Sequence, residues 1–148
     1  MRKIEYIFVD SDRETRDGKP VRHAVSNLGY HFVVNSQGFV LSPTDVCIPV
    51  HIISGPVYDP DKYNRCSIFI RYCGAIRAGF WNIEHDSSCN AVMQQRAALI
   101  RLLVQLRSHF PNAKILDVSE IDGRELYSRN IIVSGAMNVL RRELSEWP

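Results

Sequence analysis

The residues that would first suggest a bound metal are the four cysteines and five histidines of this chain. The cysteines form no Cys-x-x-Cys pair and have no histidine pair beside them, so the spacings that structural zinc sites use do not occur. Free cysteines in a reducing compartment are usually buried and unreactive. We therefore expect small buried or half-buried side chains at Cys47, Cys66, Cys73 and Cys89.

Two other sets of polar residues could carry chemistry. Asp10, Ser11 and His51 have the residue types of a hydrolytic trio, but no Gly-x-Ser-x-Gly elbow surrounds the serine. An oxygen site for a harder cation could be formed by Asp10, Asp117, Ser119 and Glu120. Such cation sites generally bring more carboxylates together at closer spacing. The sequence therefore favours neither set.

The first half of the chain predicts strands that would position these residues. Residues 3–9 are mostly apolar and β-rich, which is typical of a strand covered on both faces. Residues 10–20 are polar and predict a loop. Residues 30–34 and 39–41 flank a polar four-residue turn that ends in Gly38, and this pattern predicts a hairpin with positive φ at the glycine.

The second half predicts two helices and two more strands. Residues 42–63 hold four of the seven prolines and predict a long irregular segment, whereas residues 66–72 predict a strand. Residues 91–110 place apolar side chains on one helical face, and a final helix is predicted to start near Gly135. Residues 115–118 predict a short strand between these helices. The order indicates one α/β domain over residues 1–148, with a central mixed sheet flanked by helices.

Composition narrows the classes of function. The 148 residues carry a net charge of +2 with no basic arm, which gives no case for nucleic acid. No stretch approaches the ~20 apolar residues of a membrane span. The N-terminus lacks the long apolar run and cleavage site of a secretory signal, so we expect a cytoplasmic chain as sequenced. The sequence gives no oligomeric state.

A block near the hairpin resembles a known family. Residues 29–38 read Gly-Tyr-His-Phe-Val-Val-Asn-Ser-Gln-Gly, which is similar to the Gly-Tyr-His-Phe, strand, polar turn and glycine block of type 2 N-acetylmuramoyl-L-alanine amidases. That family includes the phage amidase-type lysozymes and shares its fold with peptidoglycan recognition proteins. Further landmarks follow in the family's order, namely His51, Tyr63-Asn64, Ser67-Ile68, and the residues that open and close the long helix, 93–99 and 110–115. The resemblance covers nearly the whole chain and implies the family's fold.

The resemblance also implies where the family's zinc would be held. In the family two His and one Cys bind the metal, which activates a water against the lactyl-alanine amide. The matching places here are Asp10, Val118 and Ser134, and a valine has no donor atom. We therefore expect these three positions to be degenerate and predict no cofactor, where the family would have zinc.

Four residues remain as candidates for binding a ligand. The resemblance places Tyr30 where the family has its catalytic tyrosine, so Tyr30 is the surviving catalytic candidate; a tyrosine on a sheet face with its hydroxyl at the surface is the alternative. His51, Tyr63 and Asn64 are the other ligand-binding candidates, although a loop histidine without function is equally compatible with the sequence. His31 is expected to be a satisfied core histidine. We interpret Ser134 as the N-cap of the last helix.

The leading hypothesis is thus a catalytically inactive amidase-like domain that binds peptidoglycan fragments, either a muropeptide or a stem peptide. One alternative is an active N-acetylmuramoyl-L-alanine amidase whose metal site is not recognised in the sequence. The other is a protein–protein interaction module on an amidase scaffold, with the proline-rich loop or the former cleft as its surface. Fold alone decides none of these, because one scaffold supports many functions.

Overall fold

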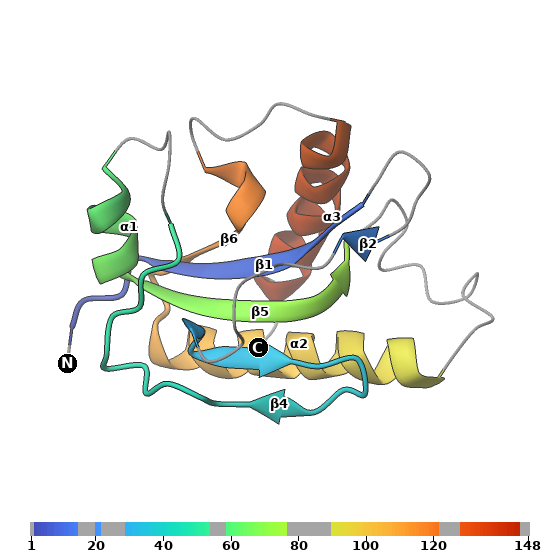
Figure 1. Ribbon diagram of the computed structural model, residues 1–148, viewed down its shortest axis with the longest axis horizontal. Helices are drawn as coiled ribbons and strands as arrows, with labels where there is room; N and C mark the ends of the chain where they lie inside the picture. The colour runs from blue at the N-terminus through green and yellow to red at the C-terminus, as the bar shows by residue number, and fades with distance from the viewer. Residues whose placement is uncertain are drawn as a thin grey trace.

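The computed structural model describes residues 2–14, 20–21, 29–53, 59–76, 90–121 and 128–145, with the side chains of 13–14, 20–21, 75, 90–92 and 128–132 excepted. Within these ranges the chain forms six strands, three α-helices and one 3-10 helix (Figure 1). The strands are β1 (Tyr6–Glu14), β2 (Pro20–Val21), β3 (Phe32–Val34), β4 (Val40–Leu41), β5 (Ser67–Ala75) and β6 (Lys114–Asp117). The helices are α1 (Pro60–Arg65), α2 (Asn90–His109), η3 (Val118–Glu120) and α3 (Ser128–Ser145).

The strands form one mixed sheet. Its order is β2-β1-β5-β3-β4, and β6 pairs with β1 on the side away from β5. The pairs β1–β5, β1–β6 and β3–β5 are parallel, whereas β1–β2 and β3–β4 are antiparallel. Because β1, β5 and β6 run in the same direction, their carboxyl ends meet at one end of the sheet. β4 forms one edge of the described sheet, and β2 and β6, which both pair with β1, form the other (Figure 1).

The two long helices cover one face of the sheet. Leu99, Leu103 and Leu106 of α2 repeat at helical spacing and are buried, which is the pattern of a core-facing helix. Met137 and Leu140 of α3 join the same core. Alternate strand residues meet these helices, among them Ile7, Val9, Ile68, Ile70 and Ile115. Figure 1 shows both helices behind the sheet, on its far face.

A second, smaller core lies on the other face of the sheet. Phe8 and Phe69 stack there with ring centroids 5.4 Å apart, and both are fully buried. They are covered by Tyr63 of α1, by η3 through Val118, and by residues 50–53. This core contains Tyr30 together with the stacked aromatic rings of Phe8 and Phe69. It is therefore the part of the fold that positions the candidate site.

Most predicted elements are confirmed. The mixed sheet flanked by helices, the hairpin, the strand at 66–72 and the helix at 91–110 all occur, with boundaries shifted by a few residues. Gly38 has a φ of 86°, as its place in the turn predicts. A Cβ at Gly38 would also lie 3.1 Å from the Gln94 backbone, so glycine lets the hairpin turn approach α2.

Several predictions were wrong. β1 continues to Glu14, so residues 10–14 are strand and not loop, because β5 and β2 pair with them. The last helix begins at Ser128 and not near Gly135, so Ser134 lies inside α3 and cannot be its N-cap. Cys47 is exposed, whereas Cys66 and Cys73 are half-buried as expected and Cys89 lies outside the described residues.

Among the described helices, none is long and apolar enough to cross a bilayer.

Candidate functional site

A cluster of charged and hydroxyl side chains occupies the carboxyl ends of β1, β5 and β6. We call it the carboxylate cluster. Its residues Asp10, Asp12, Tyr30 and Arg71 lie on the face of the second core, whereas Ser11 and Asp117 lie on the face that the long helices cover. Each residue as a whole is no more than 8% exposed. The parallel registers explain the gathering, because Asp10 pairs with Arg71 on β5 while the preceding Val9 pairs with Asp117 on β6. Buried charges require partners, so the contacts of each member matter.

Tyr30 and Asp10 form the first contact in the cluster. The Tyr30 hydroxyl donates to Oδ2 of Asp10 at 2.5 Å, the short length typical of a hydroxyl bound to a carboxylate. Burial, and then the nearby Asp10 carboxylate, raise the pKa of Tyr30 above its usual value of 10.0. The phenol therefore keeps its proton at neutral pH and acts as a donor.

Asp12 and Arg71 form a buried ion pair next to it. Nη2 of Arg71 bonds Oδ1 of Asp12, and Nη1 donates to the carbonyl oxygens of Asp10 at 3.2 Å and Tyr72 at 2.9 Å. The register of β1 against β5 shifts between Ser11 and Asp12, and such a bulge re-aims the side chains beside it. The guanidinium thus contacts both strands where their register shifts.

Asp117 links the cluster to η3. Its Oδ2 accepts from the Ser11 hydroxyl at 3.1 Å, and its Oδ1 accepts from the Ser119 amide at 2.8 Å. The Glu120 carboxylate accepts a hydrogen bond from the Asp117 amide at 2.8 Å, which completes a capping box at the start of η3. Arg141 of α3 then binds Glu120 with two contacts of 3.0 Å. Of the oxygens considered for a hard cation, those of Asp117, Ser119 and Glu120 are therefore engaged in contacts among β6, η3 and α3, whereas Asp10 is bonded to Tyr30.

The three positions that the sequence resemblance would match to zinc ligands differ in their surroundings. Asp10 is bound to Tyr30, and Val118 packs in the same apolar core as Tyr30. Ser134 lies on α3, whose neighbouring Val133 and Met137 pack against the other face of the sheet. In the part of the chain that is described, no group of three or more His, Cys, Asp or Glu side chains could hold a metal ion.

His51, Tyr63 and Asn64 gather near the opposite end of β1. The Asn64 side chain is buried, accepts from the amides of Ile52 and Ile53 at 3.0 and 2.8 Å, and donates to the Ile53 carbonyl at 2.9 Å. Asn64 therefore fixes the loop onto α1. Nδ1 of the exposed His51 lies 3.4 Å from the Asn64 amide nitrogen.

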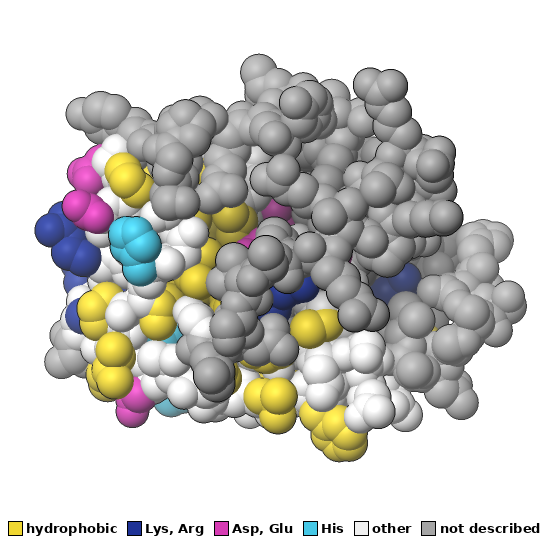
Figure 2. All heavy atoms as spheres, in the orientation of Figure 1, with side chains coloured by type: hydrophobic (Ala, Val, Ile, Leu, Met, Phe, Trp, Pro, Cys, Tyr) yellow, Lys and Arg dark blue, Asp and Glu magenta, His cyan; other side chains and the backbone are white. Residues whose placement is uncertain are grey.

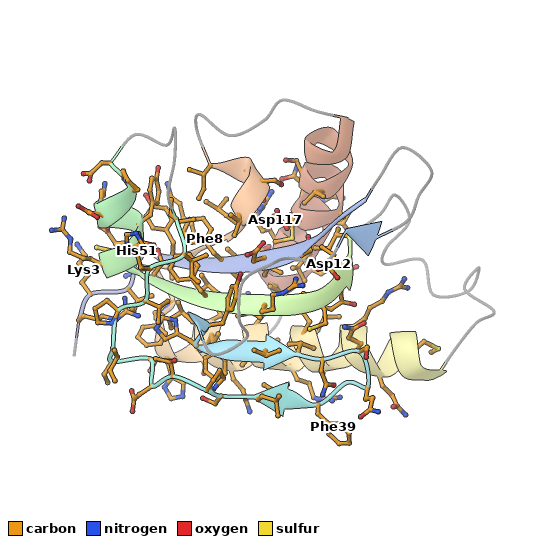
Figure 3. All side chains as sticks on the ribbon, in the orientation of Figure 1. Lys3, Phe8, Asp12, Phe39, His51 and Asp117 are labelled. Atoms are coloured by element: carbon orange, nitrogen blue, oxygen red, sulfur yellow. The ribbon has the colours of Figure 1, made fainter. Side chains whose placement is uncertain are left out.

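Tyr63 packs its ring against Phe8, with the centroids 5.9 Å apart. Figure 3 shows Phe8 between His51 on one side and Asp117 and Asp12 on the other. The four ligand-binding candidates thus lie on one face of the sheet, with Tyr30 inside the carboxylate cluster and the other three beyond Phe8. Burial of the Tyr30 hydroxyl excludes the alternative of a surface hydroxyl.

His31 is buried and fully bonded, as expected. Its Nδ1 accepts from the Phe69 amide at 3.0 Å, so Nε2 carries the hydrogen and donates to the Ile48 carbonyl at 2.7 Å. Burial lowers the pKa of His31 below 6.5. His31 thus links residues 48 and 69, and its role is structural.

The ion pair of Asp12 and Arg71 was missed from the sequence. A signal was present, because Arg71 interrupts an apolar strand and a charge in such a place needs a buried partner. The partner itself could not be chosen, since Asp12 was assigned to a loop.

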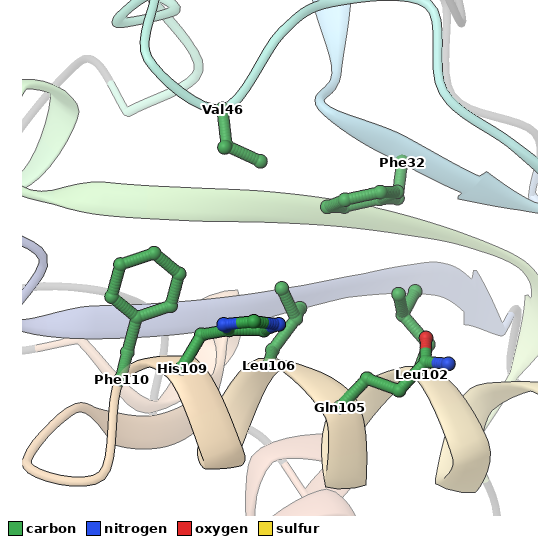
Figure 4. Close-up of a pocket in the computed structure, with 7 residues that line it drawn as sticks. All are labelled: Phe32, Val46, Leu102, Gln105, Leu106, His109 and Phe110. Atoms are coloured by element: carbon green, nitrogen blue, oxygen red, sulfur yellow. The ribbon is translucent and has the colours of Figure 1, made fainter. Parts of the chain in front are cut away.

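A separate groove of about 580 Å³ lies on the face of the sheet that the helices cover (Figure 4). It is lined by Phe32, Val46, Leu102, Gln105, Leu106, His109 and Phe110. None of the residues singled out from the sequence as site residues lines it. The groove is therefore distinct from the strip between His51 and the carboxylate cluster.

Comparison with known proteins adds no family to this geometry. No family model matches the sequence, and no curated protein matches it.

Proposed function

We propose that the chain is a non-catalytic amidase-like domain that binds peptidoglycan fragments, either a muropeptide or a free stem peptide. The hydrogen bond between Tyr30 and Asp10 is the observation that carries the proposal. In this bond the tyrosine that the resemblance identifies as catalytic donates to the carboxylate that stands at the first zinc-ligand position. A catalytic zinc needs three protein ligands and an open position for water.

The second position supports the same proposal. Val118 offers no donor atom, and its side chain is 6% exposed within the core that holds Phe8 and Tyr30. The carboxylate of Asp10 cannot replace three ligands by itself. These side chains therefore give no support to chemistry that relies on a metal-activated water. The strip between His51 and the carboxylate cluster, in contrast, has polar and aromatic groups.

The strip offers contacts that suit a short peptide with carboxylates and amides. His51 is exposed, and its imidazole can donate to or accept from a peptide group. The half-buried ring of Tyr63 gives an apolar surface next to it. Fixing the loop through Asn64 orders His51 before a ligand arrives, which lowers the entropic cost of binding.

Isothermal titration with muramyl dipeptide and with free stem peptide, up to millimolar concentration, tests the proposal. We expect saturable heat for at least one of them and a binding constant weakened about tenfold in His51→Ala, a loss of about 1.4 kcal/mol. His109→Ala is the matched control, because His109 is also exposed but lines the groove on the other face. Absence of heat and of chemical-shift changes would reject the proposal.

Zinc analysis and a peptidoglycan release assay on the same preparation separate binding from catalysis. Zinc at one equivalent per chain together with amidase activity would replace this proposal by that of an active enzyme.

A further inference from the structure

The outer edge of the sheet exposes an unusual run of apolar side chains. Phe39, Val40 and Leu41 are consecutive and are 63%, 42% and 50% exposed. Val40 and Leu41 form β4, which pairs only with β3 among the described strands. Figure 2 shows hydrophobic side chains along the lower rim of the molecule, where Figure 1 places β4, and Figure 3 shows Phe39 directed away from the body at this rim. Apolar side chains thus lie beside an open strand edge.

Within the described part of the chain, this edge lacks the usual protection against pairing with another strand. Proteins blunt exposed edges with lysine and other charged residues, with proline or with bulges. From Asn35 to Thr44 the chain has no charged residue, and its proline, Pro43, follows the strand and does not interrupt it. An exposed apolar edge without charge is typical of a surface that another strand covers.

The register of the hairpin determines which backbone groups face outward. The Asn35 amide donates to the Phe39 carbonyl at 3.0 Å, so these residues form the hydrogen-bonded pair that closes the turn. Val34 and Val40 are the next pair, and Val33 and Leu41 the one after. Since hydrogen-bonded and non-hydrogen-bonded pairs alternate in antiparallel ladders, the N–H and C=O of Val40 point away from β3.

We propose that β4 pairs antiparallel with β4 of a second copy of the chain, about a twofold axis at Val40. Each Val40 amide then donates to the Val40 carbonyl of the other copy, giving two symmetric hydrogen bonds. In this register Phe39 faces Leu41 of the second copy, and the twofold repeats the pair, so two apolar cross-strand contacts form. The absence of charge between residues 35 and 44 means that no like charges meet on the paired strands.

The small contact surface sets the strength of the dimer. β4 is two residues long, so the interface is smaller than the roughly 1,200 Å² at which stable complexes begin. The dimer is accordingly a weak one, with a dissociation constant on the order of 100 µM. This inference concerns the sheet edge and does not rest on the proposed function.

Sedimentation equilibrium of the full chain, from about 10 µM to about 1 mM, tests the proposal across that constant. We expect the mean mass to rise from that of the monomer toward twice that value. Val40→Pro removes the outward N–H that the dimer needs. It leaves the hydrogen bonds inside the hairpin intact, because this N–H does not take part in them. It should weaken association about tenfold or more.

Leu41→Lys provides a second variant, because it sets a charge in the paired edge without changing the backbone. Ser145→Lys is its control, since it adds the same charge at an exposed position of α3, which is not part of the paired edge. Circular dichroism checks that each variant folds. A chain that stays monomeric at the highest concentration overturns the proposal and leaves β4 to an extended segment of a different protein. Association that both Val40→Pro and Leu41→Lys leave unchanged overturns it as well.

Discussion

The Tyr30 hydroxyl donates to the Asp10 carboxylate at 2.5 Å, although both side chains are almost fully buried, at 1% and 8% exposure. A buried carboxylate is costly unless donors satisfy it. Tyr30 supplies one donor, and the neighbouring Arg71 guanidinium supplies positive charge through its contact with the Asp10 carbonyl. The pair therefore belongs to the interactions that hold the carboxyl end of the sheet.

Removing the phenolic oxygen should destabilise the fold measurably. We expect Tyr30→Phe to lower the free energy of unfolding by about 2 kcal/mol, because a hydrogen bond to a buried charged group is lost. Tyr6→Phe is the control, since the ring of Tyr6 also stacks on an aromatic of this core, 5.5 Å from Phe8, and it should change stability by less than about 0.5 kcal/mol. Urea denaturation measures both. Equal losses in the two variants would contradict this account.

The same burial predicts abnormal behaviour at alkaline pH. The pKa of Tyr30 is raised by burial and by Asp10, and the pKa of Tyr72 is raised by burial, both above 10.0. Since the folded-state pKa exceeds the unfolded one, the stability that these protonated tyrosines contribute is fully present below pH 10 and falls as the pH rises above it.

Tyrosinate absorbance during an alkaline titration measures this effect. Of the six tyrosines, Tyr30 and Tyr72 should ionise only as the chain unfolds. Tyr30→Phe should lose part of the alkaline dependence of stability. If all tyrosines titrate in one step near pH 10 while the fold persists, the burial of these two hydroxyls is wrong.

The ion pair of Asp12 and Arg71 should show strong coupling. Both side chains are nearly buried, at 10% and 7% exposure, so Arg71→Met leaves a buried carboxylate and should cost about 3–5 kcal/mol. Adding Asp12→Asn should recover a substantial part of this loss, because the unpaired charge is then gone. Lys3→Met is the control, since the 3.6 Å pair of Lys3 with Glu5 is largely exposed and should cost less than about 0.5 kcal/mol. Additive effects of the two cluster substitutions would refute a direct pair.

Local patterns in the sequence were sufficient for the elements that have a clear period or turn. The stripe of Leu99, Leu103 and Leu106 predicted α2, and Gly38 with its polar neighbours predicted the hairpin turn. The strand at 10–14 could not be found this way. Its residues are polar, and they are extended because β5 and β2 lie beside them, which is a tertiary effect.

The candidate site was predictable only in part for the same reason. The resemblance selected Asp10, Tyr30 and Val118, and the fold brings these three to the same face. Asp12 and Arg71 are 59 residues apart, and only the register of β1 against β5 makes them partners. The N-cap assigned to Ser134 failed because the helical pattern was read from Gly135, whereas α3 starts at Ser128.

His31 should make the fold sensitive to mild acid. Burial, in the first place, lowers its pKa below 6.5, and a proton added at Nδ1 would face the Phe69 amide hydrogen that this nitrogen now accepts. Because the folded-state pKa is lower than the unfolded one, stability is fully present above pH 6.5 and declines as the pH falls below it toward the folded-state value. Urea denaturation at a series of pH values measures the decline. We expect His31→Gln to have a smaller acid dependence than the parent, whatever its stability at neutral pH. A parent chain whose stability does not change between pH 7 and about pH 5 would show that His31 is protonated without cost, and the neutral, doubly bonded ring described here would then be incorrect.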